Sequence, residues 1–383
     1  MKKLLLISQL AATALFAQQP PLPQSPDVHA DGRVTFRFRD PNALKVAVNI
    51  EGIKDPLPMQ KDEQGLWSVT TDPLKPDLYG YSFDADGVHL LDPSNPLMKP
   101  NLLNQSNVVR VPGASPLPWE PANIPHGTIH HHFYKSAIVG DNRDFYVYTP
   151  PGYDPNASAR YPVLYLLHGY SDDASGWTAV GKANLILDSL IDQGKARPML
   201  IVMPLGYGAP EIVQRTPAFA APFRNTALRE KNFTNFRAAL IDEVIPAVER
   251  MYKVDGTRDA RAIAGLSMGG SESLLTGLNR LDKFSWVGAF SSGGLGEEFG
   301  ADFPQLSSSA NAQLHLLWIA CGTEDSLIKL NRDLVAWLQE KQIRLTPVET
   351  PGMHTWMVWR RNLIEFAPLL FRPAAATATP MAR

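Results

Sequence analysis

The sequence predicts an α/β fold with a mostly parallel sheet, preceded by a small all-β domain. Three observations support this prediction. Several short segments between residues 28 and 112 alternate apolar and polar residues with period two. After about residue 128, short apolar strand segments alternate with helical segments. Finally, a glycine-flanked serine at 265–269 has the form of a tight turn between a strand and a helix.

The chain opens with a segment typical of an export signal. Two lysines precede a short, mainly apolar core at 4–16, and Ala17 is a suitable cleavage site. We therefore expect a signal peptide at 1–17 and a secreted or periplasmic protein; a membrane anchor is the alternative. The single cysteine of the chain is Cys321, so we expect neither an intramolecular disulfide nor a lipid attached near the signal.

Residues 28–112 are predicted to form a small β-sandwich. Apolar residues occupy alternate positions at 34–38, 46–50 and 79–83, and turn sequences rich in Asp, Asn and Gly separate these runs. The segment resembles the immunoglobulin-like modules at the N-termini of glycogen-branching-type enzymes and of some esterases. Such modules can bind polysaccharide through exposed aromatic residues. The aromatic residues considered for this role are Trp67, Tyr79 and Tyr81, but their alternating positions favour a place in the core.

Residues 113–127 contain four prolines and are predicted to be a semi-rigid linker. A second domain is expected at 128–372, where strands predicted at 145–148, 163–167 and 199–203 alternate with helices. This alternation favours a mostly parallel sheet covered on both faces. The remaining residues, 373–383, are of low complexity and are expected to be a disordered tail.

The serine turn has the pattern of a nucleophile elbow. The letters GLSMG at 265–269 match G-x-S-x-G, in which small residues flank a serine held at the junction of a strand and a helix. An apolar run at 260–264 precedes the turn, and a helix-compatible run at 271–278 follows it. Ser267 is therefore the candidate nucleophile.

The order of the residues downstream of the serine is that of the α/β-hydrolase fold, in which an acid and then a histidine follow the nucleophile. An apolar run at 314–320 leads into Glu324 and Asp325, and either acid could orient the base. His354 follows the next strand-like run. The only other downstream histidine is His315, which lies in a strand-like run, so His354 is the candidate general base.

The oxyanion hole is predicted from the same fold. The strand expected at 161–167 ends in His168 and Gly169, and the loop after this strand donates one backbone N–H. The residue after the nucleophile donates the other. These donors are assigned to Tyr170 and Met268. His168 is interpreted as a structural residue that shapes the loop.

Together these stretches resemble the family-1 carbohydrate esterases, the group of feruloyl and acetylxylan esterases related to esterase D. The matching motifs are VYTPPGY at 147–153, LYLLHG at 164–169, MPLGYG at 203–208, GLSMGG at 265–270, CGTED at 321–325 and GMHTW at 352–356. They cover nearly two-thirds of the chain. The resemblance implies that Asp325, which closes the Gly-Thr-x-Asp run, is the acid of a catalytic triad with Ser267 and His354.

The resemblance implies a secreted serine esterase that needs no cofactor. The leading hypothesis is a feruloyl esterase acting on esterified plant cell-wall polysaccharide such as arabinoxylan. The alternatives are an acetylxylan esterase, a siderophore esterase of the enterobactin type, and a non-catalytic glycan-binding protein. Aromatic residues near the motifs are candidate walls of an acyl slot: Trp177, Tyr207, Trp356 and Trp359.

Several other classes of partner are not expected. Lysine and arginine number 36 against 38 acids, and there is no basic stripe to suggest nucleic-acid binding. No apolar run beyond the N-terminal segment is long enough to span a membrane. The run His130-His131-His132 is not expected to bind a metal, because successive strand residues point to opposite faces. Asp172 and Asp173, just after the oxyanion loop, are expected at the surface.

Overall fold

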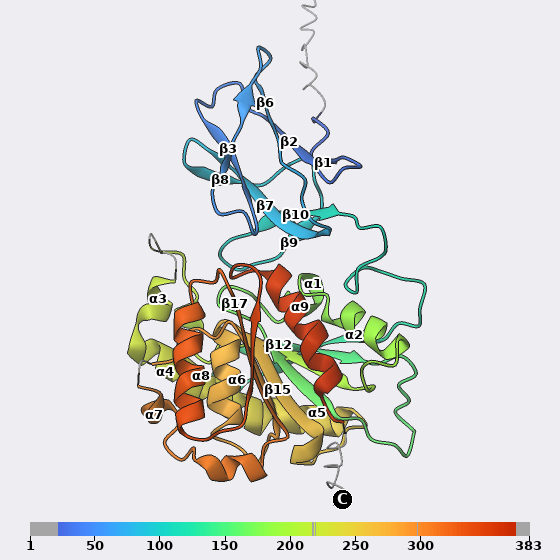
Figure 1. The fold of residues 1–383 in the computed structure, drawn as a ribbon, viewed down its shortest axis with the longest axis vertical. Coiled ribbons are helices and arrows are strands. Elements are labelled where there is room, and N and C mark those ends of the chain that lie inside the picture. Colours follow the sequence, from blue (N-terminus) through green and yellow to red (C-terminus); the bar gives the residue numbers. More distant parts are fainter. Residues whose placement is uncertain (1–21, 217, 219, 297, 373–383) are drawn as a thin grey trace, which may run out of the picture.

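The computed structural model describes residues 22–216, 218, 220–296 and 298–372. Within these ranges the chain forms a smaller all-β part and a larger α/β part (Figure 1). The expected signal peptide at 1–17 and the expected tail at 373–383 lie outside the described residues. None of the helices in the described ranges has the length and apolar character needed to cross a membrane.

The smaller part is a sandwich of antiparallel strands. Its strands are β1 (Asp27–Val28), β2 (Val34–Arg39), β3 (Val46–Ile50), β4 (Leu57–Pro58), β5 (Gln60–Lys61), β6 (Leu66–Thr70), β7 (Asp77–Ala85), β8 (Val88–Leu90), β9 (Met98–Lys99) and β10 (Ser106–Val111). Among the described residues, one sheet has the order β1-β2-β6-β5 and the other has the order β4-β3-β7-β10-β9, with β8 paired to β7. Apolar side chains from both sheets share one core.

The aromatic residues considered as a sugar platform lie in this core. Trp67, Tyr79 and Tyr81 are all buried, and the ring of Tyr81 packs against that of Phe36 with 4.7 Å between centroids. Their period-two positions place them on the inner face of the sandwich, as the alternation favoured. These three rings therefore do not offer an exposed surface for stacking on sugars.

The larger part is organised around a single mostly parallel sheet. Its strands are β11 (Thr128–Lys135), β12 (Asn142–Thr149), β13 (Val163–Leu167), β14 (Leu200–Pro204), β15 (Arg261–Leu266), β16 (Trp286–Phe290), β17 (Leu316–Gly322) and β18 (Thr346–Thr350). In the described residues their order is β11-β12-β14-β13-β15-β16-β17-β18. The first three strands pair antiparallel, and the others pair in parallel from β14 to β18. The central strands β13, β14 and β15 are buried throughout, as expected for a sheet covered on both faces.

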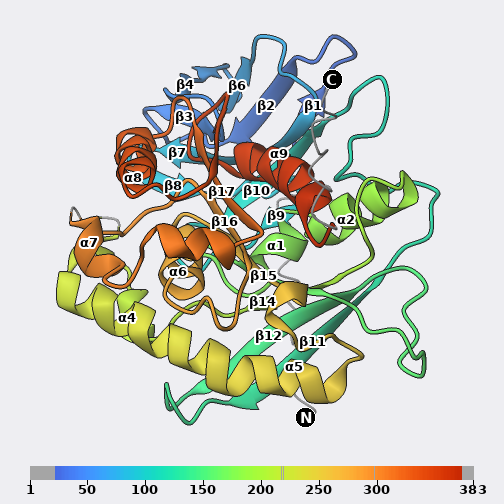
Figure 2. The same ribbon diagram turned by 60° about the horizontal axis from the view of Figure 1, so that its bottom comes forward.

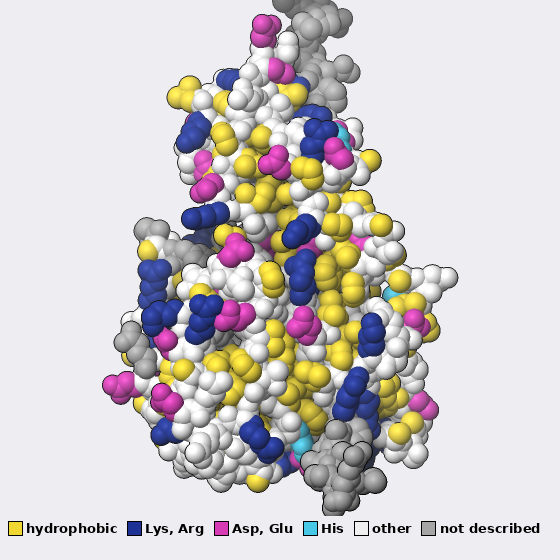
Figure 3. All heavy atoms as spheres, in the orientation of Figure 1, with side chains coloured by type: hydrophobic (Ala, Val, Ile, Leu, Met, Phe, Trp, Pro, Cys, Tyr) yellow, Lys and Arg dark blue, Asp and Glu magenta, His cyan; other side chains and the backbone are white. Residues whose placement is uncertain are grey.

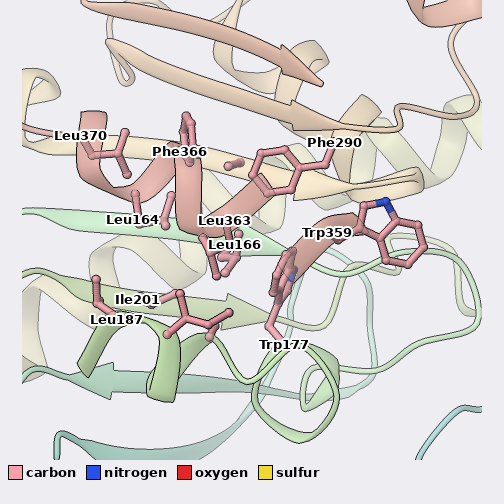
Figure 4. Packing of buried hydrophobic residues seen from close by; sticks show 14 of the residues in the cluster. Leu164, Leu166, Trp177, Leu187, Ile201, Phe290, Trp359, Leu363, Phe366 and Leu370 are labelled. Atoms are coloured by element: carbon pink, nitrogen blue, oxygen red, sulfur yellow. The ribbon is translucent and has the colours of Figure 1, made fainter. Parts of the chain in front are cut away.

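Helices cover both faces of this sheet (Figure 2). They are α1 (Gly176–Ala179), α2 (Ala183–Asp192), α3 (Ala221–Arg224), α4 (Thr226–Ala239), α5 (Ile245–Met251), α6 (Met268–Gly277), α7 (Phe299–Asp302), α8 (Ile328–Glu340) and α9 (Trp356–Phe366). One apolar core lies on the side of α1, α2 and α9, and a second lies on the side of α4, α5, α6 and α8. Figure 4 shows the first core, in which Leu363 and Phe366 of α9 pack beside Leu164 and Leu166 of β13.

The sequence predicts a bend near Pro246 in the long helical segment that carries Phe236 and Val248. The structure has a π-helical stretch, Leu240–Val244, between α4 and α5. Proline has no backbone N–H to continue the α-helical ladder, so the wider turn before it absorbs the irregularity. The apolar stripe stays buried on both sides of this stretch.

The two parts are joined by a buried ion-pair cluster. Asp77 at the start of β7 accepts hydrogen bonds from Arg360 at 2.7 Å and from Arg361 at 2.6 Å, both on α9. The linker at 113–127 packs at this junction, because Trp119 is buried and lies 5.3 Å below the Arg360 guanidinium. In Figure 3 apolar side chains gather on this face where the sandwich meets the larger part.

Candidate active site

Ser267 occupies a strained turn at the end of β15. Its φ is +52° and its ψ is −116°, values that a residue with a side chain adopts rarely and at a cost. Small neighbours make the turn feasible, because a Cβ at Gly265 would overlap the carbonyl group of Gly269. Helix α6 begins directly after the serine, at Met268. The turn therefore has the strand–serine–helix form that the G-x-S-x-G pattern predicts.

His354 lies between Ser267 and Asp325. Its Nε2 is 3.0 Å from Ser267 Oγ, and its Nδ1 is 2.8 Å from Asp325 Oδ2. A neutral imidazole satisfies both contacts when Nδ1–H donates to the carboxylate and Nε2 accepts from the serine hydroxyl. Three residues from separate loops, after β15, β17 and β18, thus form one hydrogen-bonded series.

The surroundings of Asp325 keep its carboxylate charged. Burial alone would raise its pKa, but hydrogen bonds from His354, the backbone N–H of Leu327 and the Ser291 hydroxyl outweigh burial and lower the pKa. Glu324 is exposed, and the carboxylate bonded to His354 Nδ1 is that of Asp325. The geometry thus separates two adjacent acids that the residue pattern alone left open.

The residues assigned to the oxyanion hole lie around the serine. Met268 is the first residue of α6, where backbone N–H groups have no acceptor within the helix. The loop after β13 passes directly over the elbow, because a Cβ at Gly169 would lie 2.6 Å from a methyl group of Leu266 and 3.3 Å from Ser267 Cβ. Tyr170 follows in this loop and lines the same cavity as the serine.

His168 links the loop after β13 to the loop after β14. Its Nδ1 is 2.8 Å from the Gly169 carbonyl, and its Nε2 accepts the N–H of Gly206 at 2.8 Å. Burial lowers the pKa of the imidazole, so the neutral form with Nδ1–H is the one that fits both partners. The ring therefore acts as a buried structural link, which agrees with the interpretation from sequence.

The serine opens into a cavity of about 490 Å³. Its wall comes from both parts of the chain: Glu51, Lys99, Asn101, Asn104, Gly169, Tyr170, Ser171, Asp172, Ala220, Phe223, Arg224, Leu266, Ser267, Gly293, Gly294, Ser326, Leu327, His354, Trp356 and Trp359. The wall includes two of the four aromatic residues predicted to bind substrate, Trp356 and Trp359. The Trp359 ring also meets the His354 ring edge to face, with 4.8 Å between centroids.

The other two aromatic residues lie elsewhere. Trp177 is fully buried in the core beside the end of the central strand β13, and its indole N–H donates to the Leu167 carbonyl at 2.9 Å (Figure 4). Tyr207 is buried in a small separate cluster, where its hydroxyl donates to the Asp172 carbonyl at 2.7 Å. Neither lines the cavity. The expectation that they form its walls is corrected: each ring fills the core and uses its polar atom to bind backbone.

Sequence reasoning missed the contribution of Asp172 and of the sandwich. Asp172 is buried, contrary to the expected surface position, and burial raises the pKa of its carboxyl group to about 7. Asn101, from the sandwich side, donates to Asp172 Oδ1 and to Ser171 Oγ, each at 3.0 Å. Leu102 donates its N–H to the Ser171 carbonyl at 2.8 Å. No local pattern signals these contacts, because they join segments about 70 residues apart.

The three adjacent histidines of β11 have hydrogen-bond partners within the protein. Across the described ranges, no cluster of three or more His, Cys, Asp or Glu side chains has a metal-binding arrangement. His130, His131 and His132 lie on β11, where His131 pairs with Asp144 at 2.7 Å and His132 bonds the Tyr252 hydroxyl at 2.6 Å. These contacts give the histidines partners within the protein.

Comparison with known proteins places the chain among esterases. The family described as "Putative esterase" matches residues 136–370. The chain is 28% identical over 353 residues to an endo-1,4-beta-xylanase/feruloyl esterase of Xylanibacter ruminicola, with 91% of this chain and 46% of the relative covered. It therefore spans about half the length of that relative. It is also 22% identical over 239 residues to an acetyl esterase of Caldicellulosiruptor saccharolyticus, covering 54% of this chain and 82% of the relative.

Two solved structures are similar in fold. A ferulic acid esterase of the anaerobic fungus Anaeromyces mucronatus aligns with a TM-score of 0.57 and 25% identity, covering 66% of this chain and 93% of that one. The enterobactin esterase of Shigella flexneri aligns with a TM-score of 0.64 and 20% identity, covering 88% of this chain and 92% of that one. The second likeness extends over more of the chain and shows a shared fold alone.

Proposed function

Because the chain belongs to the esterase family that matches residues 136–370, we propose that it hydrolyses carboxylic esters with Ser267, His354 and Asp325 as its catalytic triad. The observation that carries the proposal is the hydrogen-bonded series of these three side chains, with distances of 3.0 Å and 2.8 Å. The buried, charged Asp325 and the strained turn at Ser267 support the same roles.

The proposed reaction has two balanced steps. Ser267 Oγ attacks the ester carbonyl carbon while its proton passes to His354 Nε2. The tetrahedral intermediate collapses as His354 gives that proton to the departing alcohol, which leaves an acyl-enzyme. Water then adds by the same route and releases the carboxylic acid and the free serine. We assign the backbone N–H groups of Tyr170 and Met268 to the oxyanion, where one such donor contributes about 3 kcal/mol.

The acyl group that we propose is a hydroxycinnamoyl group such as ferulate, carried on plant cell-wall polysaccharide. The sequence relative named as a xylanase/feruloyl esterase supports this choice, as does the fungal ferulic acid esterase structure. Aromatic and apolar residues in the cavity wall, Phe223, Leu327 and Trp359, would suit a flat conjugated acyl chain. The expected N-terminal export signal fits action outside the cytoplasm. We also propose that the sandwich is an immunoglobulin-like module, as its sequence resemblance implies.

Two other ester classes are further candidates. The acetyl esterase relative supports an acetyl ester as substrate, and the glycan that would carry the acetyl group is part of our proposal. The enterobactin esterase shares the fold over 88% of the chain, so a siderophore ester is the second candidate. A purely glycan-binding role without catalysis is disfavoured, because the serine, histidine and acid are all present and hydrogen bonded.

Hydrolysis of methyl ferulate and p-nitrophenyl acetate by the wild type and by Ser267→Ala tests the proposal. Ser308→Ala is the matched control, since Ser308 is an exposed serine outside the cavity. Release of ferulate by the wild type and the control, lost in Ser267→Ala, is the expected result. Cleavage of acetate alone would retain the serine mechanism and move the substrate to acetyl or siderophore esters. Activity that survives in Ser267→Ala would contradict the proposed nucleophile.

A further inference from the structure

One buried acid in the cavity wall has an unused hydrogen-bonding atom. The Asp172 residue is 5% exposed and lines the same cavity as Ser267. Its Oδ1 accepts from Asn101, whereas its Oδ2 has no hydrogen-bond partner among the described residues. A buried polar atom normally has a partner, so an oxygen that meets the cavity instead is suited to a ligand hydroxyl.

The sandwich adds more polar groups beside this acid. Asn104 is exposed, its backbone N–H donates to Asn101 Oδ1 at 2.8 Å, and its side-chain amide has no partner in the part of the chain that the structure describes. Lys99 also lines the cavity and is held by Glu51 at 3.0 Å. Asn101 itself is fully engaged in fixing the loop at 171–172 and the backbone of Asn104. Together these residues form a polar frame that presents an amide, a carboxyl group and an ammonium group to the cavity.

This frame lines the same cavity as Ser267 and His354. His354 must deliver its proton to the departing alcohol oxygen, so that alcohol lies next to the histidine. From His354 a continuous series leads to the frame: Trp356, two residues on, donates its N–H to Glu51, and Glu51 binds Lys99. Phe223, from α3, packs against Tyr170 and lies beside Gly294 in the same cavity.

We propose that Asp172, Lys99 and Asn104 form a subsite for the alcohol portion of the ester, and that this portion is a sugar. The inference rests on the proposed esterase function and adds where the glycan binds. Sugar hydroxyls both donate and accept hydrogen bonds, which matches a site composed of an amide, a carboxyl group and an ammonium group. The alcohol portion of a simple methyl ester has no hydroxyl groups that could bind these side chains. The sandwich thereby contributes to leaving-group recognition at the reaction centre.

The test compares two esters that share an acyl group and differ in the alcohol. We would measure kcat/KM for methyl ferulate and for a feruloyl ester of arabinose, using the wild type, Asn104→Ala and Asp172→Asn. Asn42→Ala is the control, because Asn42 is an exposed asparagine of the same sandwich outside the cavity. The same comparison with p-nitrophenyl acetate and an acetylated xylo-oligosaccharide covers the alternative acyl group.

The expected result is a lower preference for the sugar ester in both cavity variants. Loss of one neutral hydrogen bond should reduce the ratio of kcat/KM for sugar ester over simple ester by about fivefold in Asn104→Ala, with no change of ratio in Asn42→Ala. Equal losses on both esters, or no loss on either, would overturn the subsite. Failure of the wild type to cleave either feruloyl ester would instead count against the feruloyl substrate, and the acetyl pair would then decide the subsite.

Discussion

Glu51 Oε1 accepts the backbone N–H of Trp356 at 3.0 Å, so a carboxylate from the sandwich caps the helix that follows His354. Helix α9 has no side-chain cap of its own at Thr355. A negative charge is stabilising at this end of a helix, where free N–H groups and the helix dipole are positive. Burial would raise the pKa of Glu51, but Lys99, Arg360 and its hydrogen bonds lower it, so the cap is charged.

The first prediction concerns this cap. Removing it in Glu51→Ala should loosen the start of α9 and displace His354, since caps contribute about 1 kcal/mol and hold the chain direction. We expect kcat for p-nitrophenyl acetate to fall by about tenfold and the Tm to fall as well. Glu51→Gln keeps an acceptor and should lose less. The control is Glu63→Ala, an exposed acid of the same sandwich, and equal activity of Glu51→Ala and this control would disprove the role.

The second prediction separates the two neighbouring acids. Asp325→Asn replaces the group that orients His354 and stabilises its charged form, so kcat should fall by about 10⁴-fold with the fold retained. Glu324→Gln changes an exposed side chain and should stay within about twofold of the wild type. Steady-state kinetics of both variants decide the matter. Comparable small losses in the two would mean that Asp325 is not the triad acid.

The third prediction concerns Ser291, a buried residue with a φ of +50°. Its Oγ accepts the indole N–H of Trp359 at 3.1 Å, and its hydroxyl group is among the causes that lower the pKa of Asp325. Ser291→Ala removes this donor, raises the pKa of Asp325 and should lower kcat by about tenfold, because hydrogen bonds to charged groups are the stronger ones.

The adjacent Ser292 provides the control for this prediction. Ser292 is equally buried, and its hydroxyl has no hydrogen-bond partner among the described residues. Ser292→Ala should therefore retain kcat, and a pH–rate profile should move only for Ser291→Ala. A profile that moves equally in both variants would mean that general packing, and not the bond to Asp325, matters here.

The fourth prediction is a pH dependence of stability at Asp172. Burial raises the pKa of this group from 3.8 to about 7, so between these values the folded protein binds a proton that the unfolded chain has released. The stabilising effect of this bound proton is therefore fully present below pH 3.8 and is lost as pH rises through about 7. Asp172→Asn removes this dependence of stability on pH.

Thermal unfolding from pH 4 to pH 9 checks the sign. The Tm of Asp172→Asn relative to the wild type should increase as pH rises toward 7 and then level off, because the wild type alone must hold a buried charge. A Tm difference that is constant with pH, or that decreases, would show that the carboxyl group of Asp172 is already charged at low pH in the folded protein.

Local patterns were sufficient to locate the sheet, the elbow and the residues that meet at Ser267. The turn at Ser267 needs small residues at fixed offsets from the serine. The acid and the histidine each follow a strand of their own, so their order along the chain was enough to find them. The choice between Glu324 and Asp325 was different in kind. The residue pattern alone left both acids open, and the family resemblance implied Asp325, which is the acid hydrogen bonded to His354 in the structure.

Long-range packing explains what the sequence could not predict. Glu51 lies 305 positions before Trp356, and Asn101 lies 71 positions before Asp172, so nothing near either acid in the sequence indicates its partner. For some aromatic residues, the sequence predicted a role in substrate binding where the structure shows a role in the core. Trp177 near the motifs suggested a substrate slot, but a large apolar ring is equally suited to the core, and it lies there.

Covalent labelling of the nucleophile tests the central claim most directly. The wild type, Ser267→Ala and Ser308→Ala would each be treated with a fluorophosphonate and analysed by intact mass and peptide mapping. We predict a single adduct on Ser267 in the wild type and in Ser308→Ala, and none in Ser267→Ala, because only a serine activated by His354 reacts readily. An adduct on another residue, or an unlabelled but folded wild type, would contradict the account.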